Sequence, residues 1–310
     1  MLDVALILLR IVQYAGASVL FGASLFLLYA LPRGGDLAPP GMVWPRPLLL
    51  AAAVLTLAGA ALGLIVQTGA MAGSFFQGFE PATLASVAGG TGLGRAAIVR
   101  SLAAAAALVA LMLIPRGQLL WGIAAALGAV ATASWAWMGH GAASEGPAAH
   151  IHLGADIFHS LAAGLWLGAL PSFLLLLWRP ALIGASAARM LYRSLEGFGL
   201  IGVTAVAVLV ITGLVNSWFL VGPDGVWTLW SSAYGRLLSA KLLLFALMLA
   251  LAAANRYRLS PLLDAALTTG GAPGAALATL RRSVTVETGS GLGILTLVAW
   301  LGTLSPVSAG

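Results

Sequence analysis

The sequence predicts an all-α membrane protein, a polytopic bundle of eight transmembrane helices. Of its 310 residues, 61% are apolar and only 8% are charged, whereas a soluble domain carries about 25% charged residues. The mean hydropathy is +1.02. The few charged residues are clustered, and the long apolar runs between them approach the ~20 residues that a membrane-spanning helix needs.

Eight apolar runs bounded by proline, glycine or charge are the predicted spans. They lie at about residues 4–31, 47–71, 95–114, 118–139, 153–178, 198–220, 235–255 and 286–304. Short helices are expected from about Pro81 and over the residues SPLLDAAL. No connection is long enough for a soluble domain, so residues 1–310 are predicted to form a single transmembrane domain. Closely packed helices are expected where glycines are four residues apart, at positions 59 and 63, 164 and 168, and 289 and 293.

The distribution of arginine predicts the orientation of the chain. Arginine is frequent in the odd-numbered connections, whereas the opposite side has only Arg95 and Arg236. The arginines of the odd-numbered connections are Arg33, Arg46, Arg116, Arg179, Arg189, Arg193, Arg256, Arg258, Arg281 and Arg282. Cytoplasmic connections are rich in arginine and lysine. Both termini are therefore predicted to be periplasmic, and the segment from Gly139 to His152 is predicted to be external.

The sequence also excludes several classes of protein. Its basic residues form no stripe, so no nucleic acid is expected as a partner. Cysteine is absent, so a site for a soft metal must use histidine or methionine. The run GGTGLGR follows no strand and lacks the lysine and hydroxyl of a phosphate-binding loop. We therefore expect neither an ATP-driven pump nor an enzyme. Asp3 precedes the first apolar run and no cleavage site follows it, so this run is expected to be retained.

All the histidines lie within twenty residues, in GHGAASEGPAAHIHLGADIFHS. On a helix, His152, Asp156 and His159 fall within an arc of about 60° and share one face. Imidazole and thioether groups suit copper, and a carboxylate can orient an imidazole. The candidate metal ligands are therefore His140, His150, His152, His159 and Met138, with Asp156 as the orienting group. The alternative is that the loop histidines are solvated and that Asp156 caps the helix.

Three basic residues, Arg10, Arg100 and Lys241, lie about six residues inside the predicted outer ends of their spans. A charge at this depth is costly, so each should face the bundle interior, pair with an anion, or extend to the lipid headgroups. Asp156 and an anionic ligand are the candidate partners. Gln13, Tyr14, Gln67 and Asn216 are further candidates for lining the same outer chamber.

The second half of the chain resembles the copper resistance protein D (CopD or PcoD) family of bacterial inner-membrane proteins. The resemblance covers about residues 150–306 and rests on HLGADIFHSLAAGLWLGALP, ITGLVNSW, YGRLLSAKLLL, NRYRLSP and RRSVTVE, in this order. It divides the chain into N-terminal spans over residues 1–149 and a CopD-like region. It implies copper import, and a periplasmic copper-binding partner of the CopC type, here a separate chain. The residues carried over are His152, Asp156, His159, Asn216, Lys241 and Glu287.

The leading hypothesis is therefore that an external cluster of histidine, methionine and aspartate accepts Cu(I) or Cu(II) and passes it into a polar path through the membrane. Arg10, Arg100 and Lys241 would repel a cation there, so they lie off the path or the metal stops at the mouth. The alternative is a haem-binding membrane protein, with His140 and His159 as axial ligands and the basic residues on the propionates. A scaffold that binds no ligand is the third hypothesis.

Overall fold

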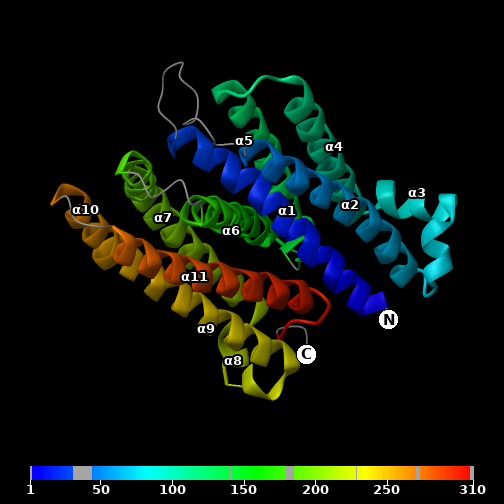
Figure 1. The fold of residues 1–310 in the computed structure, drawn as a ribbon. Helices are drawn as coiled ribbons and strands as arrows, with labels where there is room; N and C mark the ends of the chain where they lie inside the picture. Colours follow the sequence, from blue (N-terminus) through cyan, green and yellow to red (C-terminus); the bar gives the residue numbers. More distant parts are fainter. Residues whose placement is uncertain are drawn as a thin grey trace.

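The computed structural model describes residues 2–30, 44–139, 141–144, 146–178, 185–227, 229–269 and 273–307. Within these ranges every regular element is a helix (Figure 1). Eight helices are long and apolar enough to cross a membrane, judged by their length and composition. The predicted all-α bundle of eight spans is thus confirmed.

The first half of the chain supplies four spanning helices. These are α1 (Leu2–Ala30), α2 (Pro45–Met71), α4 (Gly92–Leu113) and α5 (Gln118–Ala133), the last extended by the 3-10 turn η2 (Ser134–Trp137). Between α2 and α4 lie the 3-10 turn η1 (Phe75–Phe79) and the helix α3 (Pro81–Gly90). The helix predicted from Pro81 is therefore confirmed. Proline suits this first position because the N–H that it lacks would have no partner within the helix.

The second half supplies the other four. They are α6 (Ala149–Leu177), α7 (Ala185–Leu220), α9 (Ala233–Ala254) and α11 (Gly274–Leu301). The short elements are η3 (Gly141–Ala143), α8 (Gly222–Gly225) and η5 (Leu229–Ser231). A π-helical turn, η6 (Asn255–Leu259), continues α9 into α10 (Ser260–Thr268). The predicted helix over SPLLDAAL is thus an extension of the seventh span.

Two spans begin earlier than predicted. The helix α7 starts at Ala185 rather than near residue 198, and α11 starts at Gly274 rather than near residue 286. Charged residues such as Arg193 and Arg282 marked the predicted limits. Backbone hydrogen bonds do not depend on apolar side chains, so each helix continues beyond its apolar run.

Both chain termini lie at one end of the bundle, which we call the terminal end, and α10 lies at the opposite end (Figure 1). Since successive spans alternate in direction, the connections that follow α2, α5 and α7 also lie at the terminal end. The helix α1 packs against α2, α5 and α6, and more lightly against α7 and α11. It is therefore the central helix.

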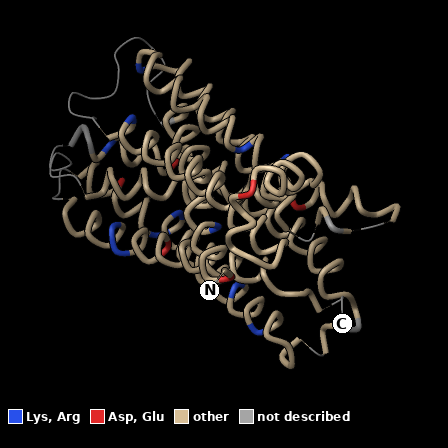
Figure 2. Tube along the Cα trace, turned by 90° about the vertical axis from the view of Figure 1, so that its right-hand side faces the viewer, with Lys and Arg blue, Asp and Glu red and all other residues tan. Residues whose placement is uncertain are grey.

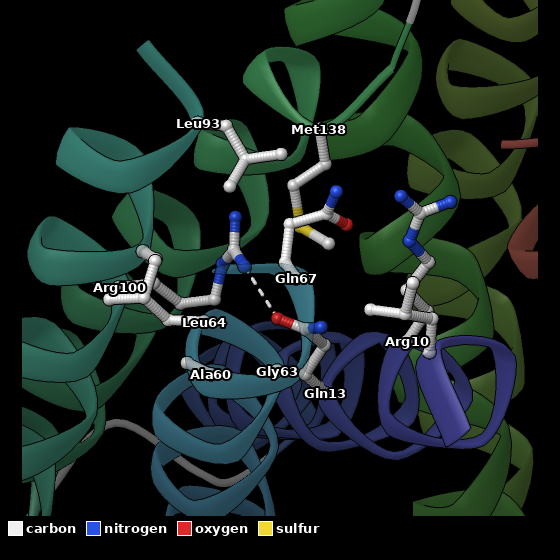
Figure 3. Close-up of a pocket in the computed structure, with 11 residues that line it drawn as sticks. Arg10, Gln13, Ala60, Gly63, Leu64, Gln67, Leu93, Arg100 and Met138 are labelled. Atoms are coloured by element: carbon white, nitrogen blue, oxygen red, sulfur yellow. Dashed lines mark hydrogen bonds between the residues drawn. The ribbon is translucent and has the colours of Figure 1, made fainter. Parts of the chain in front are cut away.

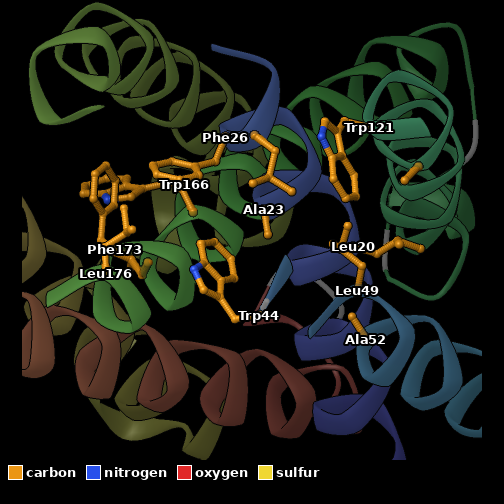
Figure 4. Packing of buried hydrophobic residues seen from close by; sticks show 14 of the residues in the cluster. Leu20, Ala23, Phe26, Trp44, Leu49, Ala52, Trp121, Trp166, Phe173 and Leu176 are labelled. Carbon is orange, nitrogen blue, oxygen red and sulfur yellow. The ribbon is translucent and has the colours of Figure 1, made fainter. Parts of the chain in front are cut away.

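The apolar core lies toward the opposite end. Phe26 of α1 meets Phe173 of α6 edge to face, with 5.0 Å between the ring centroids. Buried Trp44, Leu49 and Trp121 belong to the same cluster (Figure 4). The buried polar side chains described below lie instead nearer the terminal end or midway along α6.

Glycines allow α1 to approach its neighbours closely. A Cβ atom on Gly168 of α6 would lie 1.7 Å from the carbonyl oxygen of Ser18, and one on Gly59 of α2 would lie 2.9 Å from Cβ of Gln13. The predicted glycine pairs of α2 and α6 therefore lie at helix contacts. In the third pair, a Cβ on Gly289 would meet nothing within 4 Å.

The outer faces of α7 and α9 are apolar. Leu200, Leu214 and Leu243 are 73%, 69% and 70% exposed, as suits helices that face lipid. Charged residues are sparse along the chain (Figure 2).

At the opposite end, arginines bind carbonyl groups where other helices finish. Nη2 of Arg46 donates to the carbonyl of Ile114 after α4, and Nε and Nη2 of Arg281 donate to the carbonyl of Leu177 at 3.1 and 2.8 Å. Cations are favoured at helix C-termini. The assignment of this end to the cytoplasm rests on the arginine distribution and stays a prediction.

Candidate functional site

A line of polar side chains on α6 faces α7 near the terminal end. It consists of His152, Asp156 and His159, which lie on one face of α6, as their spacing predicts. Each contacts one residue of α7, and these partners are, in the same order, Phe219, Asn216 and Thr212. We call the three residues of α6, together with their three partners on α7, the α6–α7 polar line.

The hydrogen bonds of His159 determine which of its ring nitrogens carries hydrogen. Nδ1 lies 2.9 Å from Oγ1 of Thr212, and this hydroxyl donates its own hydrogen to the carbonyl of Val208 at 2.6 Å. Because Oγ1 has only one hydrogen, it accepts from Nδ1. The ring of His159 also hydrogen-bonds the backbone of Leu209. We infer that the neutral ring carries its hydrogen on Nδ1, in which case Nε2 keeps the lone pair that can bind a metal.

The carboxylate of Asp156 is held from two sides. Its Oδ1 accepts from Nδ2 of Asn216 at 2.6 Å, and the backbone N–H of Gly141 donates to the same carboxylate. A Cβ on Gly141 would lie 2.2 Å from Oδ2, so this approach requires glycine. Oδ1 of Asn216 is buried and has no hydrogen-bond partner among the described residues.

Lys241 of α9 is a cation close to the α6–α7 polar line. It interacts electrostatically with both Asp156 and His159. Tyr234, also on α9, is close enough to Asp156 to interact with it electrostatically. Lys241 is half-buried, and its interaction with Asp156 favours the alternative in which the two side chains pair; this pairing stays a prediction.

His152 is almost completely buried. Its ring stacks on Phe219 with 4.5 Å between centroids and 5° between planes, and its Nδ1 lies 2.7 Å from Oγ of Ser144. These contacts fix the plane of the imidazole. The side chain is therefore held in the bundle and is not solvated.

The predicted ligands do not form one compact cluster. Among the described residues, no group of three or more histidine, aspartate or glutamate side chains could hold a metal ion. His152 and His159 are two turns apart, a rise of about 10 Å, whereas two nitrogen ligands of one ion lie within about 4 Å of each other. These two imidazoles cannot share an ion in this conformation.

The other predicted ligands lie elsewhere. His150 is exposed on the first turn of α6, and His140 lies outside the described residues. Met138 lines a cavity together with Arg10 and Arg100 (Figure 3). Gln13 and Gln67 line the same cavity, whereas Tyr14 and Asn216 are not among its lining residues.

The carboxylate of Glu287 on α11 is buried beside α6, farther toward the opposite end. Oε1 of Glu287 accepts from Nε1 of Trp166 at 2.8 Å, and Oε2 accepts from Nδ2 of Asn255 at 2.9 Å. Trp166 is two helical turns beyond His159, and Asn255 begins the π-helical turn after α9. A separate buried polar cluster thus lies at mid-bundle, two helical turns beyond the α6–α7 polar line.

Reasoning from the sequence missed several of these contact residues, among them Thr212, Phe219, Ser144, Trp166 and Asn255. A threonine one turn from Asn216 and a tryptophan two turns from His159 are signals that the spacing does offer. Ser144 lies in a loop, and the loop geometry that brings it to His152 cannot be read from spacing.

Comparison with known proteins decides the family. The chain is 39% identical over 305 residues to the copper resistance protein D of Pseudomonas syringae pv. tomato, covering 97% of this chain and 96% of the relative. The chain belongs to the copper resistance protein D family. It is therefore a multi-pass inner-membrane protein of a copper-resistance family.

Two family models of copper resistance protein D match. The N-terminal domain model matches residues 1–151, and the copper resistance protein D model matches residues 192–301. The inner membrane protein YebZ of Escherichia coli K12 is 29% identical over 271 residues, covering 84% of this chain and 86% of YebZ. No solved structure matches the chain. The division into residues 1–149 and 150–306 stays a prediction.

The haem alternative gains no support from the described residues of this CopD-family chain. The three described histidines, His150, His152 and His159, all lie on α6. A pair of axial ligands from neighbouring helices is therefore not present among them.

Proposed function

We propose that this protein imports copper across the inner membrane, and that copper enters along the α6–α7 polar line. The observation that carries the proposal is the Nδ1 hydrogen bond of His159 to Thr212, because it leaves Nε2 as a ligand for Cu(I) or Cu(II). Asp156, three residues earlier on the same helical face, offers a negative charge beside it. The protein then acts as a transporter and not as an enzyme.

A sparse donor set suits a transported ion. An ion that crosses a membrane must bind well enough to enter and weakly enough to leave. In this proposal His159 binds copper briefly and Asp156 supplies a compensating negative charge. His152 is an earlier contact nearer the terminal end, and Glu287 is the next carboxylate on the path. Asn216 orients Asp156.

The basic residues repel copper on this path less than the sequence alone suggests. Arg10 and Arg100 lie among α1, α2 and α4, so they stand aside from the α6–α7 polar line. Lys241 acts electrostatically on both Asp156 and His159. The carboxylate therefore offsets the lysine while copper is bound.

The remaining parts of the proposal rest on the orientation and on the family resemblance. With periplasmic termini, copper enters from the periplasm, where a separate CopC-like protein delivers it. His140, His150 and Met138 are then ligands that capture copper at the mouth. Lipids surround the bundle.

The test is copper uptake by the purified protein in lipid vesicles that contain a chromogenic copper chelator. We expect His159→Ala to abolish uptake and Thr204→Val, at an exposed threonine of α7, to leave uptake unchanged. His140→Ala tests the histidine outside the described residues. Gel filtration and thermal unfolding verify that each variant is folded. Uptake by folded His159→Ala at the wild-type rate would refute the proposal.

A further inference from the structure

A second polar site lies away from the α6–α7 polar line, among α1, α2 and α4 near the terminal end. It is a cavity of about 20 Å³. Figure 3 shows the guanidinium groups of Arg10 and Arg100 on two sides of it, with the side chains of Gln67 and Met138 drawn between them. Of its lining residues the copper proposal uses only Met138.

The two arginines are buried in different ways. Arg100 is 1% exposed; its Nε donates to Oγ of Ser134 at 2.9 Å, its Nη2 to the carbonyl of Ser134 at 3.1 Å, and its Nη1 to Oε1 of Gln13. Arg10 is 5% exposed, and its buried Nε and Nη1 have no hydrogen-bond partner among the described residues. Nη1 lies against Gly302 at the end of α11, where a Cβ atom would be 2.5 Å from it, and no described side chain accepts from Nε or Nη1.

The cavity carries no negative charge of its own. None of its eleven lining residues is acidic, and the partners of Arg100 are neutral. Asp156 acts electrostatically on nearby Tyr14, but its carboxylate is bonded to Asn216 and Gly141 and interacts with Lys241. Two buried cations therefore lie together without an acidic partner in the cavity.

A buried charge is tolerated where an opposite charge compensates it. We propose that this cavity binds a small monovalent anion of the size of chloride. The guanidinium of Arg10 supplies the free donors, Arg100 supplies charge, and the amide groups of Gln13 and Gln67 are neutral donors at the same wall.

The size of the cavity selects among anions. A volume of about 20 Å³ has room for about one water-sized group, which is closer to the size of a halide than to that of phosphate, sulfate or a lipid headgroup. Gly63 contributes to the space, since a Cβ there would lie 3.4 Å from Nε2 of Gln13. The site is thus selective by volume as well as by charge.

The experiment measures thermal unfolding of the detergent-solubilised protein while chloride or bromide replaces gluconate at constant ionic strength. Ligand that binds only the folded state raises the midpoint in a saturable way. We expect a rise of about 2–5 °C with either halide, and none with sulfate or phosphate. Arg10→Gln should abolish the rise, whereas Arg95→Gln, at an exposed arginine of α4, should keep it.

A second measurement does not depend on any variant folding. Crystals of the wild-type protein soaked in bromide should show an anomalous peak between Arg10 and Arg100. A wild-type midpoint that halides do not change, a halide response that Arg10→Gln retains, or a bromide map without this peak would overturn the proposal. None of these outcomes depends on copper transport.

Discussion

Nδ1 of His159 on α6 donates a hydrogen bond to Oγ1 of Thr212 on α7, across 2.9 Å. Thr212 in turn donates to the carbonyl of Val208. The backbone of α7 thereby selects the tautomer of a histidine on another helix, so the metal-binding ability of Nε2 depends on a threonine that is not itself a ligand.

The first prediction follows from this pair. Thr212→Val keeps the shape of the side chain but removes the acceptor for Nδ1, so the ring is free to rotate and to change tautomer. We expect copper affinity to fall about 10- to 100-fold, the usual effect of removing a group that orients a ligand. The measurement is a competition titration with a chromogenic copper chelator. Thr204→Val, at an exposed threonine of the same helix, is the control, and equal affinities for the two variants would contradict the assignment.

The second prediction compares two positions of the polar line. His159→Ala should weaken copper binding more than Asp156→Asn, because the first removes a bond to the metal and the second removes only a nearby negative charge. The same titration ranks the two variants. The reverse order would assign the ligand role to Asp156.

The third prediction separates folding from transport at Glu287. Glu287→Leu leaves the donors of Trp166 and Asn255 without an acceptor, at a cost of about 2–6 kcal/mol for the two groups. In Glu287→Gln the new amide can donate to Oδ1 of Asn255, which has no partner among the described residues, once the asparagine amide turns over. We expect this variant to remain stable in denaturant unfolding but to take up copper more slowly, since the negative charge is lost. Uptake at the wild-type rate would remove Glu287 from the path.

The fourth prediction concerns the contact between α1 and α6. Gly168→Ala places a Cβ atom 1.7 Å from the carbonyl of Ser18, so the helices must separate, and we expect a loss of about 1–3 kcal/mol. Gly289→Ala, where nothing lies within 4 Å, should instead stabilise α11 by about 0.5–1 kcal/mol. Thermal unfolding of both variants in the same detergent measures the two changes in stability. A shift of the same sign in both would show that helix packing does not govern the difference.

The fifth prediction addresses orientation. With a periplasmic C-terminus, a C-terminal fusion to a reporter that is active only in the cytoplasm should be silent, and a fusion to one that is active only in the periplasm should be active. The arginine distribution is the reason. A bright cytoplasmic reporter would reverse the direction of transport proposed above.

The sequence predicts much of the fold because each span must bury its own backbone polar groups in hydrocarbon, and this requirement appears as a long apolar run. The same logic located Pro81 at the start of α3. It misplaced the beginnings of α7 and α11, because a helix does not have to end where its charged residues begin.

The site was predicted in part. Helical spacing alone placed His152, Asp156 and His159 on one face. Spacing along one helix does not indicate the partners on other helices, so Thr212, Trp166 and Asn255 were missed. It also suggested one compact metal cluster, whereas His152 and His159 lie two turns apart.

The sequence by itself determined that this chain crosses the membrane eight times and that its polar groups gather near one end, because hydropathy and helical periodicity are properties of each segment alone. The tertiary structure decided which groups meet: Asp156 with Asn216, Glu287 with Trp166, and Arg10 with no hydrogen-bonding neighbour for its buried Nε and Nη1 among the described residues. Such pairings depend on how separate helices rotate and cross, which close contacts such as that between Gly168 and Ser18 fix.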